Sequence, residues 1–298
     1  MQGLIIINAY PNGEKFYRQA ERIGAELQSL GVKTDIYRNG EVSAKLRSTG
    51  DVSALLPKKY DFAVYLDKDK YLGKMLERTG LRLFNSASAV ETCDDKLCTY
   101  LALQNANVSI AESIPAPLCY TPNAKADETF LATVADQLGF PLVMKTSYGS
   151  FGAGVQLVTG MPELIETEQN NLYRPHFYQR YIAEASGRDI RVIVIGGKAV
   201  AAMERVAQAG EFRSNIELGG RGRAIALSPK ISSVAERAAQ ALALDYCGVD
   251  VLLSKDGALI CEVNSNAFFE GLESATGVNV AKKYAEYVVE RVKRGKKS

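Results

Sequence analysis

Short apolar runs alternate with amphipathic stretches through the first third of the chain. Residues 4–10, 32–37 and 62–66 are rich in β-branched and aromatic side chains and predict three strands. Between the first two, residues 14–31 carry apolar side chains at helical spacing and end at a glycine, which predicts a helix. Strands that alternate with helices indicate a small α/β domain with a mainly parallel sheet.

A second pattern begins after this domain. Residues 89–105 predict a helix with Ser88 as its N-cap. The segment 113–123 contains three prolines and marks a domain boundary. A further helix is expected near residues 128–138, and residues 139–160 predict a strand, a glycine-rich loop and another strand.

The predicted strands become longer beyond residue 177. We expect them at residues 177–182, 189–197, 198–207 and 222–227, followed by a helix at 231–244 and a last strand pair at 249–254 and 258–264. The whole pattern predicts three domains, at residues 1–88, 89–177 and 178–298.

The last strand pair predicts a β-hairpin with a defined register. A three-residue loop, residues 255–257, ends in a glycine, which is a common hairpin connection. If Ser254 faces Ala258, counting back along both strands places Asp250 opposite Glu262. Two carboxylates that face each other repel, and the residues around them are apolar, so water alone is a poor remedy.

A bound cation would resolve this repulsion. Asn264 lies on the same face as Glu262, two residues further along. A set of oxygen ligands without histidine or cysteine favours Mg²⁺ or Mn²⁺ over zinc, and Mg²⁺ completes its shell with water and substrate phosphates. The alternative is a hairpin end that frays into water.

The glycine-rich loop, residues 147–154, follows Lys145 at the end of a predicted strand. Glycines let backbone N–H groups approach phosphate oxygens, and a neighbouring lysine adds a charge. The loop joins two strands, so it is neither a Walker loop, which opens a helix, nor a GxGxxG loop after the first strand. A mobile hairpin that closes over phosphates fits this arrangement, and an ordinary flexible hairpin is the alternative.

Three arginines, Arg191, Arg205 and Arg213, recur in the predicted strands that follow, each beside a polar residue. Individually, such arginines are more often salt-bridged or solvated than functional. Together with the carboxylate hairpin, they supply the fixed cations that phosphoryl transfer requires.

Composition excludes several classes of partner. The 298 residues are 47% hydrophobic, and 36 basic residues nearly balance 34 acidic ones. No global field therefore marks a nucleic-acid binder or a protein of anionic membranes. No apolar run approaches the ~20 residues of a membrane span, and the start lacks the features of a signal peptide. We therefore expect a cytoplasmic protein.

Histidine and cysteine chemistry is limited as well. His176 is the single histidine, so zinc sites built on several histidines are excluded, and a structural or surface role is expected for it. The cysteines are odd in number and lack CxxC spacing, which predicts reduced core thiols. They are Cys93, Cys98, Cys119, Cys247 and Cys261.

Six stretches resemble the RimK-type ATP-grasp ligases. They are DDKLCTYLAL, PLVMKTSYGSFGAGVQLV, QRYIAEASGRDIRVIVIGGKAVAAMERVA, GEFRSNIELGG, GVDVLLSKDGALICEVNSN and EGLESATGVNVA. The resemblance runs from about residue 84 to the end, and more loosely through the first domain. It implies a Rossmann-like α/β pre-ATP-grasp domain, followed by a two-part ATP-grasp fold of the α+β type.

The resemblance also implies the roles of individual residues. It assigns nucleotide contacts to Lys96, Lys145, Ser147, Gly149, Gly152, Gly154, Gln179, Arg180, Tyr181, Asp189, Arg213, Ser214 and Asn215. The two lysines would meet the phosphates, residues 179–181 would contact adenine through their backbone, and Asp189 would lie near the ribose. Catalysis would rest on Lys145, Arg205 and Arg213, with Arg205 anchoring the carboxylate. The metal ligands would be Asp250, Glu262 and Asn264.

The implied activity is that of an ATP-dependent carboxylate–amine ligase with an acyl-phosphate intermediate and two Mg²⁺ or Mn²⁺ ions. Glutamate or another amino acid would be joined to a protein, peptide or cofactor, and homo-oligomers are common in the family. After EVN, however, the chain continues SNAFF where the family has a small residue, serine, proline and glycine. The acceptor therefore stays open. A dipeptide ligase and an ATP-binding sensor without catalysis are the alternatives.

Overall fold

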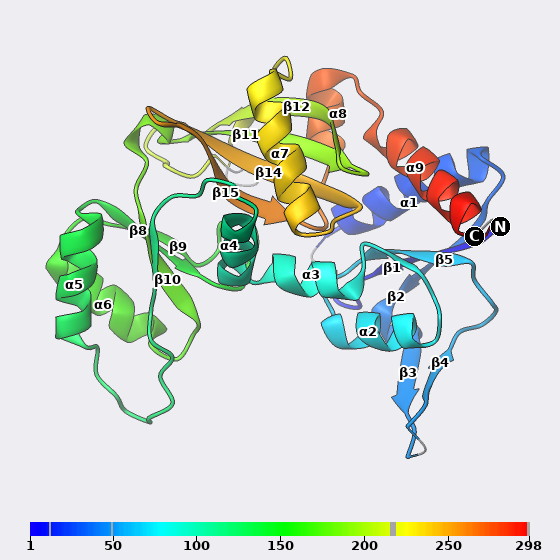
Figure 1. The fold of residues 1–298 in the computed structure, drawn as a ribbon, viewed down its shortest axis with the longest axis horizontal. Coiled ribbons are helices and arrows are strands. Elements are labelled where there is room, and N and C mark those ends of the chain that lie inside the picture. The colour runs from blue at the N-terminus through cyan, green and yellow to red at the C-terminus, as the bar shows by residue number, and fades with distance from the viewer. Residues whose placement is uncertain (12, 49, 215–218, 297–298) are drawn as a thin grey trace.

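The structure is a computed structural model that describes residues 1–11, 13–48, 50–214 and 219–296. Figure 1 shows helices packed around three sheets, with a two-stranded ribbon projecting from one end. The predicted mixed α/β architecture is confirmed, whereas the three domain boundaries stay a prediction. Within the described residues, the structure contains no helix that is both long and apolar enough to span a membrane.

The first sheet is parallel, as predicted, with the strand order β2-β1-β5-β6. Its strands are β1 (Gln2–Ile7), β2 (Lys33–Arg38), β5 (Phe62–Leu66) and β6 (Leu83–Phe84), and the nearby helices are α1 (Lys15–Ser29) and α2 (Lys70–Arg78). The central strands β1 and β5 are apolar because both of their faces are packed, one toward α1 and the other toward α2.

The projecting ribbon was not predicted. It follows a short 3-10 helix, η1 (Asn39–Glu41), and pairs β3 (Ser43–Leu46) with β4 (Val52–Leu55) in antiparallel register. Most of its side chains are exposed or half-buried, so its sequence lacks the apolar run that signals a strand.

The predicted helix over residues 89–105 is wrong in one respect: it is two helices. These are α3 (Ala87–Asp94) and α4 (Lys96–Asn105), and Asp95 between them has extended backbone angles. The Asp95 carboxylate accepts hydrogen bonds from the first turn of α4, and Ser86, rather than Ser88, caps α3. Aspartate favours such a cap over a helix interior, and the break makes Lys96 the first residue of α4.

The second sheet is antiparallel, with the order β7-β10-β8-β9. Its strands are β7 (Ser113–Pro115), β8 (Leu142–Thr146), β9 (Val155–Val158) and β10 (His176–Arg180), and α5 (Glu128–Leu138) and α6 (Met161–Asn171) pack against it. Figure 1 shows this sheet and its two helices as a separate lobe at the left.

A buried polar network lies beneath this sheet. His176 Nε2 lies 2.8 Å from Glu168 Oε2, and the Tyr178 hydroxyl donates to the same oxygen at 2.5 Å. Burial alone would raise the pKa of Glu168, but the hydrogen bonds from His176 and Tyr178 lower it below 4.5. Burial alone would lower the pKa of His176, but Glu168 and the Arg174 carbonyl raise it above 6.5. The structural role expected for His176 is confirmed.

We expect Glu168→Gln to lower the free energy of unfolding by about 2 to 3 kcal/mol near pH 6. The His176 contribution is complete below pH 6.5 and is lost as the pH rises through its raised folded pKa. The Glu168 contribution is present above pH 4.5 and is lost as the pH falls through its lowered folded pKa. Urea unfolding from pH 4.5 to 8.5 measures the effect, which should narrow toward pH 8.5. Glu166→Gln, on the exposed side of α6, is the control.

The third sheet has the order β13-β12-β11-β14-β15, and all its pairs are antiparallel. Its strands are β11 (Arg188–Ile195), β12 (Lys198–Val206), β13 (Arg221–Ala224), β14 (Tyr246–Ser254) and β15 (Gly257–Asn264), and β11 follows the 3-10 helix η2 (Ala183–Ala185). One face packs against α4 and α7 (Pro229–Ala241). The other packs against α8 (Glu270–Thr276) and α9 (Val280–Gly295), which join it to α1 and the first sheet.

The last hairpin corrects the predicted register. Its turn has two residues, so Ser254 faces Gly257 rather than Ala258. A β-bulge at Cys261 then inserts one residue, and Asp250 faces Glu262 as predicted. The predicted carboxylate pair is therefore confirmed, although the assumed turn is wrong. The turn is one residue shorter than assumed and the bulge adds one residue to β15, so the two differences cancel where Asp250 faces Glu262.

Candidate active site

A cavity of about 120 Å³ is lined by strands of both the second and the third sheet. Its wall includes most of the predicted nucleotide-binding residues, namely Lys96, Lys145, Gly149, Gly152, Gln179, Arg180, Tyr181, Asp189, Arg213 and Ser214. The side chain of Arg180 and its backbone N–H both bond to Glu112, so its contact with adenine stays a prediction.

Three predicted residues are not part of this wall. Ser147 is buried, and its carbonyl accepts a hydrogen bond from the Lys96 backbone. Gly154 has φ +73, and a Cβ there would lie 2.3 Å from Thr146 Oγ1, so its glycine is required by packing. Asn215 lies outside the described residues.

Three cations hold the glycine-rich loop over the cavity. Lys96 Nζ donates to the Gly149 carbonyl at 3.0 Å, and Arg213 Nη1 donates to the Gly152 carbonyl at 3.1 Å. Lys68, from the segment after β5, donates to Ser150 Oγ at 3.1 Å. Lys68 was missed by sequence reasoning because it lies in a different part of the chain from the loop. Side chains from the segment after β5, from α4 and from the segment after β12 therefore hold the loop closed over the cavity.

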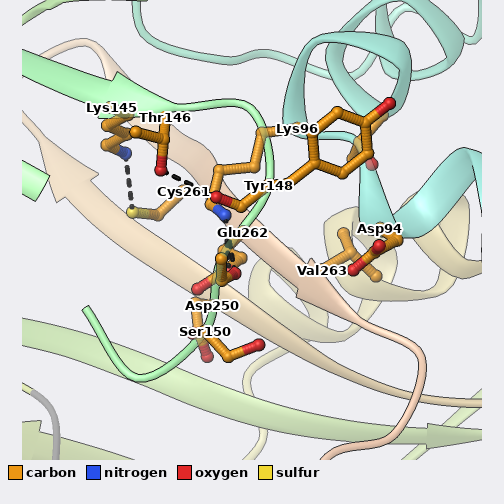
Figure 2. A network of polar contacts seen from close by, with 12 residues as sticks. Asp94, Lys96, Lys145, Thr146, Tyr148, Ser150, Asp250, Cys261, Glu262 and Val263 are labelled. Carbon is orange, nitrogen blue, oxygen red and sulfur yellow. Dashed lines mark hydrogen bonds and ion pairs between the residues drawn. The ribbon is translucent and has the colours of Figure 1, made fainter. Parts of the chain in front are cut away.

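The two predicted lysines face the final hairpin. Figure 2 shows Lys145 pointing toward Cys261 and Lys96 toward Glu262, at distances of 3.6 Å in each pair. Burial alone would lower the pKa of Lys145, but Cys261, Tyr100 and Glu262 raise it above its usual value. Lys145 is therefore a cation at neutral pH, as phosphate binding requires.

Cys261 is not the core thiol that was predicted. The β-bulge places it on the same side as Glu262, so both side chains line the cavity. Cys98 is exposed and Cys119 half-buried, which leaves Cys93 and Cys247 as buried thiols. All five cysteines are free in the structure.

The arginines of this site form cross-strand ion pairs. Asp189 faces Arg205 across β11 and β12, and Arg191 faces Asp250 across β11 and β14. Arg205 donates to both Asp189 oxygens, at 2.7 and 2.5 Å, and also lies 2.8 Å from Asp250. Burial alone would raise the pKa of Asp250, but Arg191 and Arg205 lower it. Arg191 and Arg205 are therefore both salt-bridged, as is usual for such arginines, and Asp189 is a partner of Arg205.

The predicted metal ligands differ in how available they are. The Glu262 carboxylate is 27% exposed and forms an ion pair with Lys96, whereas the Asp250 carboxylate is only 4% exposed and is held by two arginines. In the part of the chain that is described, no three His, Cys, Asp or Glu side chains are grouped for a metal ion. The oxygen set of Asp250, Glu262 and Asn264 fits Mg²⁺ only with further oxygens from water and phosphates.

A second cavity, of about 410 Å³, adjoins the first. Arg205 and Glu262 line both cavities, and Asn264 lines the second. The remaining walls come from the ends of β1 and β5, the first turns of α1 and α8, the strands β11 and β12, the tip of the glycine-rich loop, and the segment before α8. Of the two phenylalanines that depart from the family pattern, Phe268 faces this cavity, whereas Phe269 belongs to the core.

Comparisons with known proteins identify the family of this chain. The RimK-like ATP-grasp domain matches residues 94–288. The chain is 37% identical over 223 residues to a probable alpha-L-glutamate ligase of Shewanella frigidimarina, covering 74% of this chain and 71% of that protein. It is 31% identical over 237 residues to human beta-citrylglutamate synthase B, covering 78% of this chain and 59% of that protein.

The fold is also shared with solved structures. D-alanine–D-alanine ligase of Bacillus anthracis, solved with ATP, superposes with a TM-score of 0.73 and 18% identity, covering 100% of this chain and 99% of that one. The sheets and helices described above are therefore an α/β ATP-grasp architecture. Ligases of this kind use ATP and divalent metal ions. The chain belongs to the RimK-like ATP-grasp family and is an ATP-dependent carbon–nitrogen ligase.

Proposed function

We propose that this enzyme phosphorylates a substrate carboxylate with ATP and then joins the acyl phosphate to the amine of an amino acid. The observation that carries the proposal is the shared wall of the two cavities. Arg205 and Glu262 line both, so a phosphate in the first cavity and a carboxylate in the second would meet there. The name of the human relative suggests a small carboxylic acid such as citrate as one class of acceptor, and proteins and peptides are the other classes that we consider.

Different residues of the chain would bind the adenine, the phosphates and the metal ion. Residues 179–181 offer backbone groups to adenine, and Lys96 and Lys145 offer cations to the phosphates. Mg²⁺ or Mn²⁺, held by Glu262 with Asn264 and Asp250, would offset phosphate charge when bound. The closed loop excludes water, which would otherwise hydrolyse the acyl phosphate. The mechanism needs no covalent enzyme nucleophile.

Trapping with hydroxylamine tests this proposal. We expect the enzyme, incubated with MgATP, hydroxylamine and a panel of carboxylates such as citrate, L-glutamate and short peptides, to form ADP and one acyl hydroxamate in equal amounts. The hydroxamate is expected because hydroxylamine attacks an acyl phosphate in place of the natural amine. Tight ATP binding without ADP or hydroxamate across the panel would instead support a sensor without catalysis.

A further inference from the structure

Three phenylalanine rings from distant segments gather at the second cavity. Phe16 lies in α1, Phe151 at the tip of the glycine-rich loop, and Phe268 before α8. Phe268 meets Phe16 edge-on at 5.0 Å between centroids and stacks on Phe151 at 6.1 Å. Phe151 remains 37% exposed. A partly exposed aromatic wall inside a cavity is a typical surface for an apolar ligand group.

The cations of this cavity already have partners. Lys15 Nζ lies over all three rings, 3.8 Å from the Phe151 centroid, 4.8 Å from that of Phe268 and 6.0 Å from that of Phe16. The other pairs among the described lining residues are Arg18–Glu270, Lys68–Asp94, Arg191–Asp250 and Arg205–Asp189. An acidic side chain such as that of glutamate would have to compete with an existing partner for any of them.

Asp67, by contrast, is a carboxylate without a cation among the described residues. It follows β5, lines the second cavity and is 5% exposed. Its Oδ1 accepts hydrogen bonds from Asn8 Nδ2 at 3.1 Å and from the Lys68 backbone at 2.6 Å. Its Oδ2 is buried and has no hydrogen-bond partner in the described part of the chain. An ammonium group would supply both the missing donor and the missing charge.

Hydrogen bonds connect the segment around Asp67 with the segments that carry Phe268 and Phe151. Asn266 Nδ2 donates to the carbonyl of Leu66, the residue before Asp67, at 2.8 Å. Lys68, the residue after Asp67, bonds to Ser150 beside Phe151. Asp67 Oδ2 is closed off from water in this structure, so the segments around it would have to move before an amine could reach it.

We propose that the second cavity binds the amine substrate, with the ammonium group at Asp67 and an apolar or aromatic side chain against Phe16, Phe151 and Phe268. The substrate is thus an amino acid or a peptide amino terminus with an apolar side chain, rather than glutamate. This assignment rests on the proposed function and specifies its amine. Phe268 is the specificity-determining residue, because it contacts both other rings.

Isothermal titration of the full chain with the non-hydrolysable analogue Mg-AMPPNP present tests the assignment. The probes are L-phenylalanine, N-acetyl-L-phenylalanine, which lacks the charged amine, L-alanine, which lacks the ring, and L-glutamate. We expect L-phenylalanine to bind at least about tenfold more tightly than each of the others, because a charged hydrogen bond and a buried ring each contribute on this scale.

Variants separate the two contacts. Asp67→Asn keeps an Oδ1 acceptor but removes the charge, so the preference for L-phenylalanine over its N-acetyl form should disappear. Phe268→Ala should remove the preference for L-phenylalanine over L-alanine. Asp245→Asn and Phe269→Leu are matched controls, because both residues lie outside the described walls of the two cavities. Unchanged AMPPNP affinity shows that each variant is folded.

Two results would overturn the assignment: tighter binding of L-glutamate than of L-phenylalanine, or amine dependence that survives in Asp67→Asn. Neither result depends on turnover. An absence of hydroxamate would count against the ligase chemistry, and the binding preferences would still test the cavity.

Discussion

We expect Glu262→Gln to lower the rate of MgATP-dependent ADP formation by about a hundredfold to a thousandfold. The substitution keeps the shape of the side chain but removes the negative charge from the wall that both cavities share. It also replaces one of the two oxygens of the carboxylate most available to a metal ion with an amide nitrogen. Steady-state ADP release with saturating substrates measures the effect.

The fold should tolerate this change, because the Glu262 side chain is 27% exposed and has one ion pair, 3.6 Å from Lys96. Glu236→Gln is the matched control: its side chain is 30% exposed, it has one lysine partner at 3.8 Å, and it lies away from both cavities. Wild-type turnover in Glu262→Gln would remove this residue from the metal and phosphate site.

Asp250→Asn has the largest expected effect on stability, a loss of about 3 kcal/mol in the free energy of unfolding. The Asp250 side chain is 4% exposed and neutralises two buried arginines, Arg191 and Arg205. Without its charge, Arg191 has no other described carboxylate within ion-pair distance, whereas Arg205 keeps Asp189. Urea unfolding, with an unchanged dependence on urea concentration, measures the loss.

Asp256→Asn, in the exposed turn of the same hairpin, is the control and should change the stability by less than about 0.5 kcal/mol. Combining Asp250→Asn with Arg191→Gln should cost less than the sum of the two single changes, because both break the same pair. A loss below about 1 kcal/mol for Asp250→Asn would show that the arginines are compensated by other groups.

Local patterns predicted much of this fold. The strands β1 and β5 are apolar along their length, and α1 has regular helical spacing. All three elements were therefore identified from residues close in sequence. The split between α3 and α4 was missed because the capping preference of Asp95 competes with a helical pattern on both sides of it. Helix boundaries depend on such single residues.

The candidate site could be predicted only in part. Lys96, Lys145 and the Asp250–Glu262 pair follow from motifs and from one hairpin. The ion pairs of Arg191 and Arg205 depend on which strands lie side by side, because each pair is a cross-strand contact within the β12-β11-β14 arrangement. The second cavity joins segments as far apart as Phe16, Asp67 and Phe268, and no local signal connects them.

Because of the bulge in β15, the number of residues between the turn and Glu262 decides which side chain faces Asp250. Ile260 and Val263 point into the core with α7, while Cys261 and Glu262 between them both face the first cavity. Losing one residue between the turn and Glu262 while the bulge is kept would slide the ladder by one position, so that Val263 would replace Glu262 opposite Asp250. Natural variation in this hairpin should therefore occur by exchange of residues, and rarely by insertion or deletion.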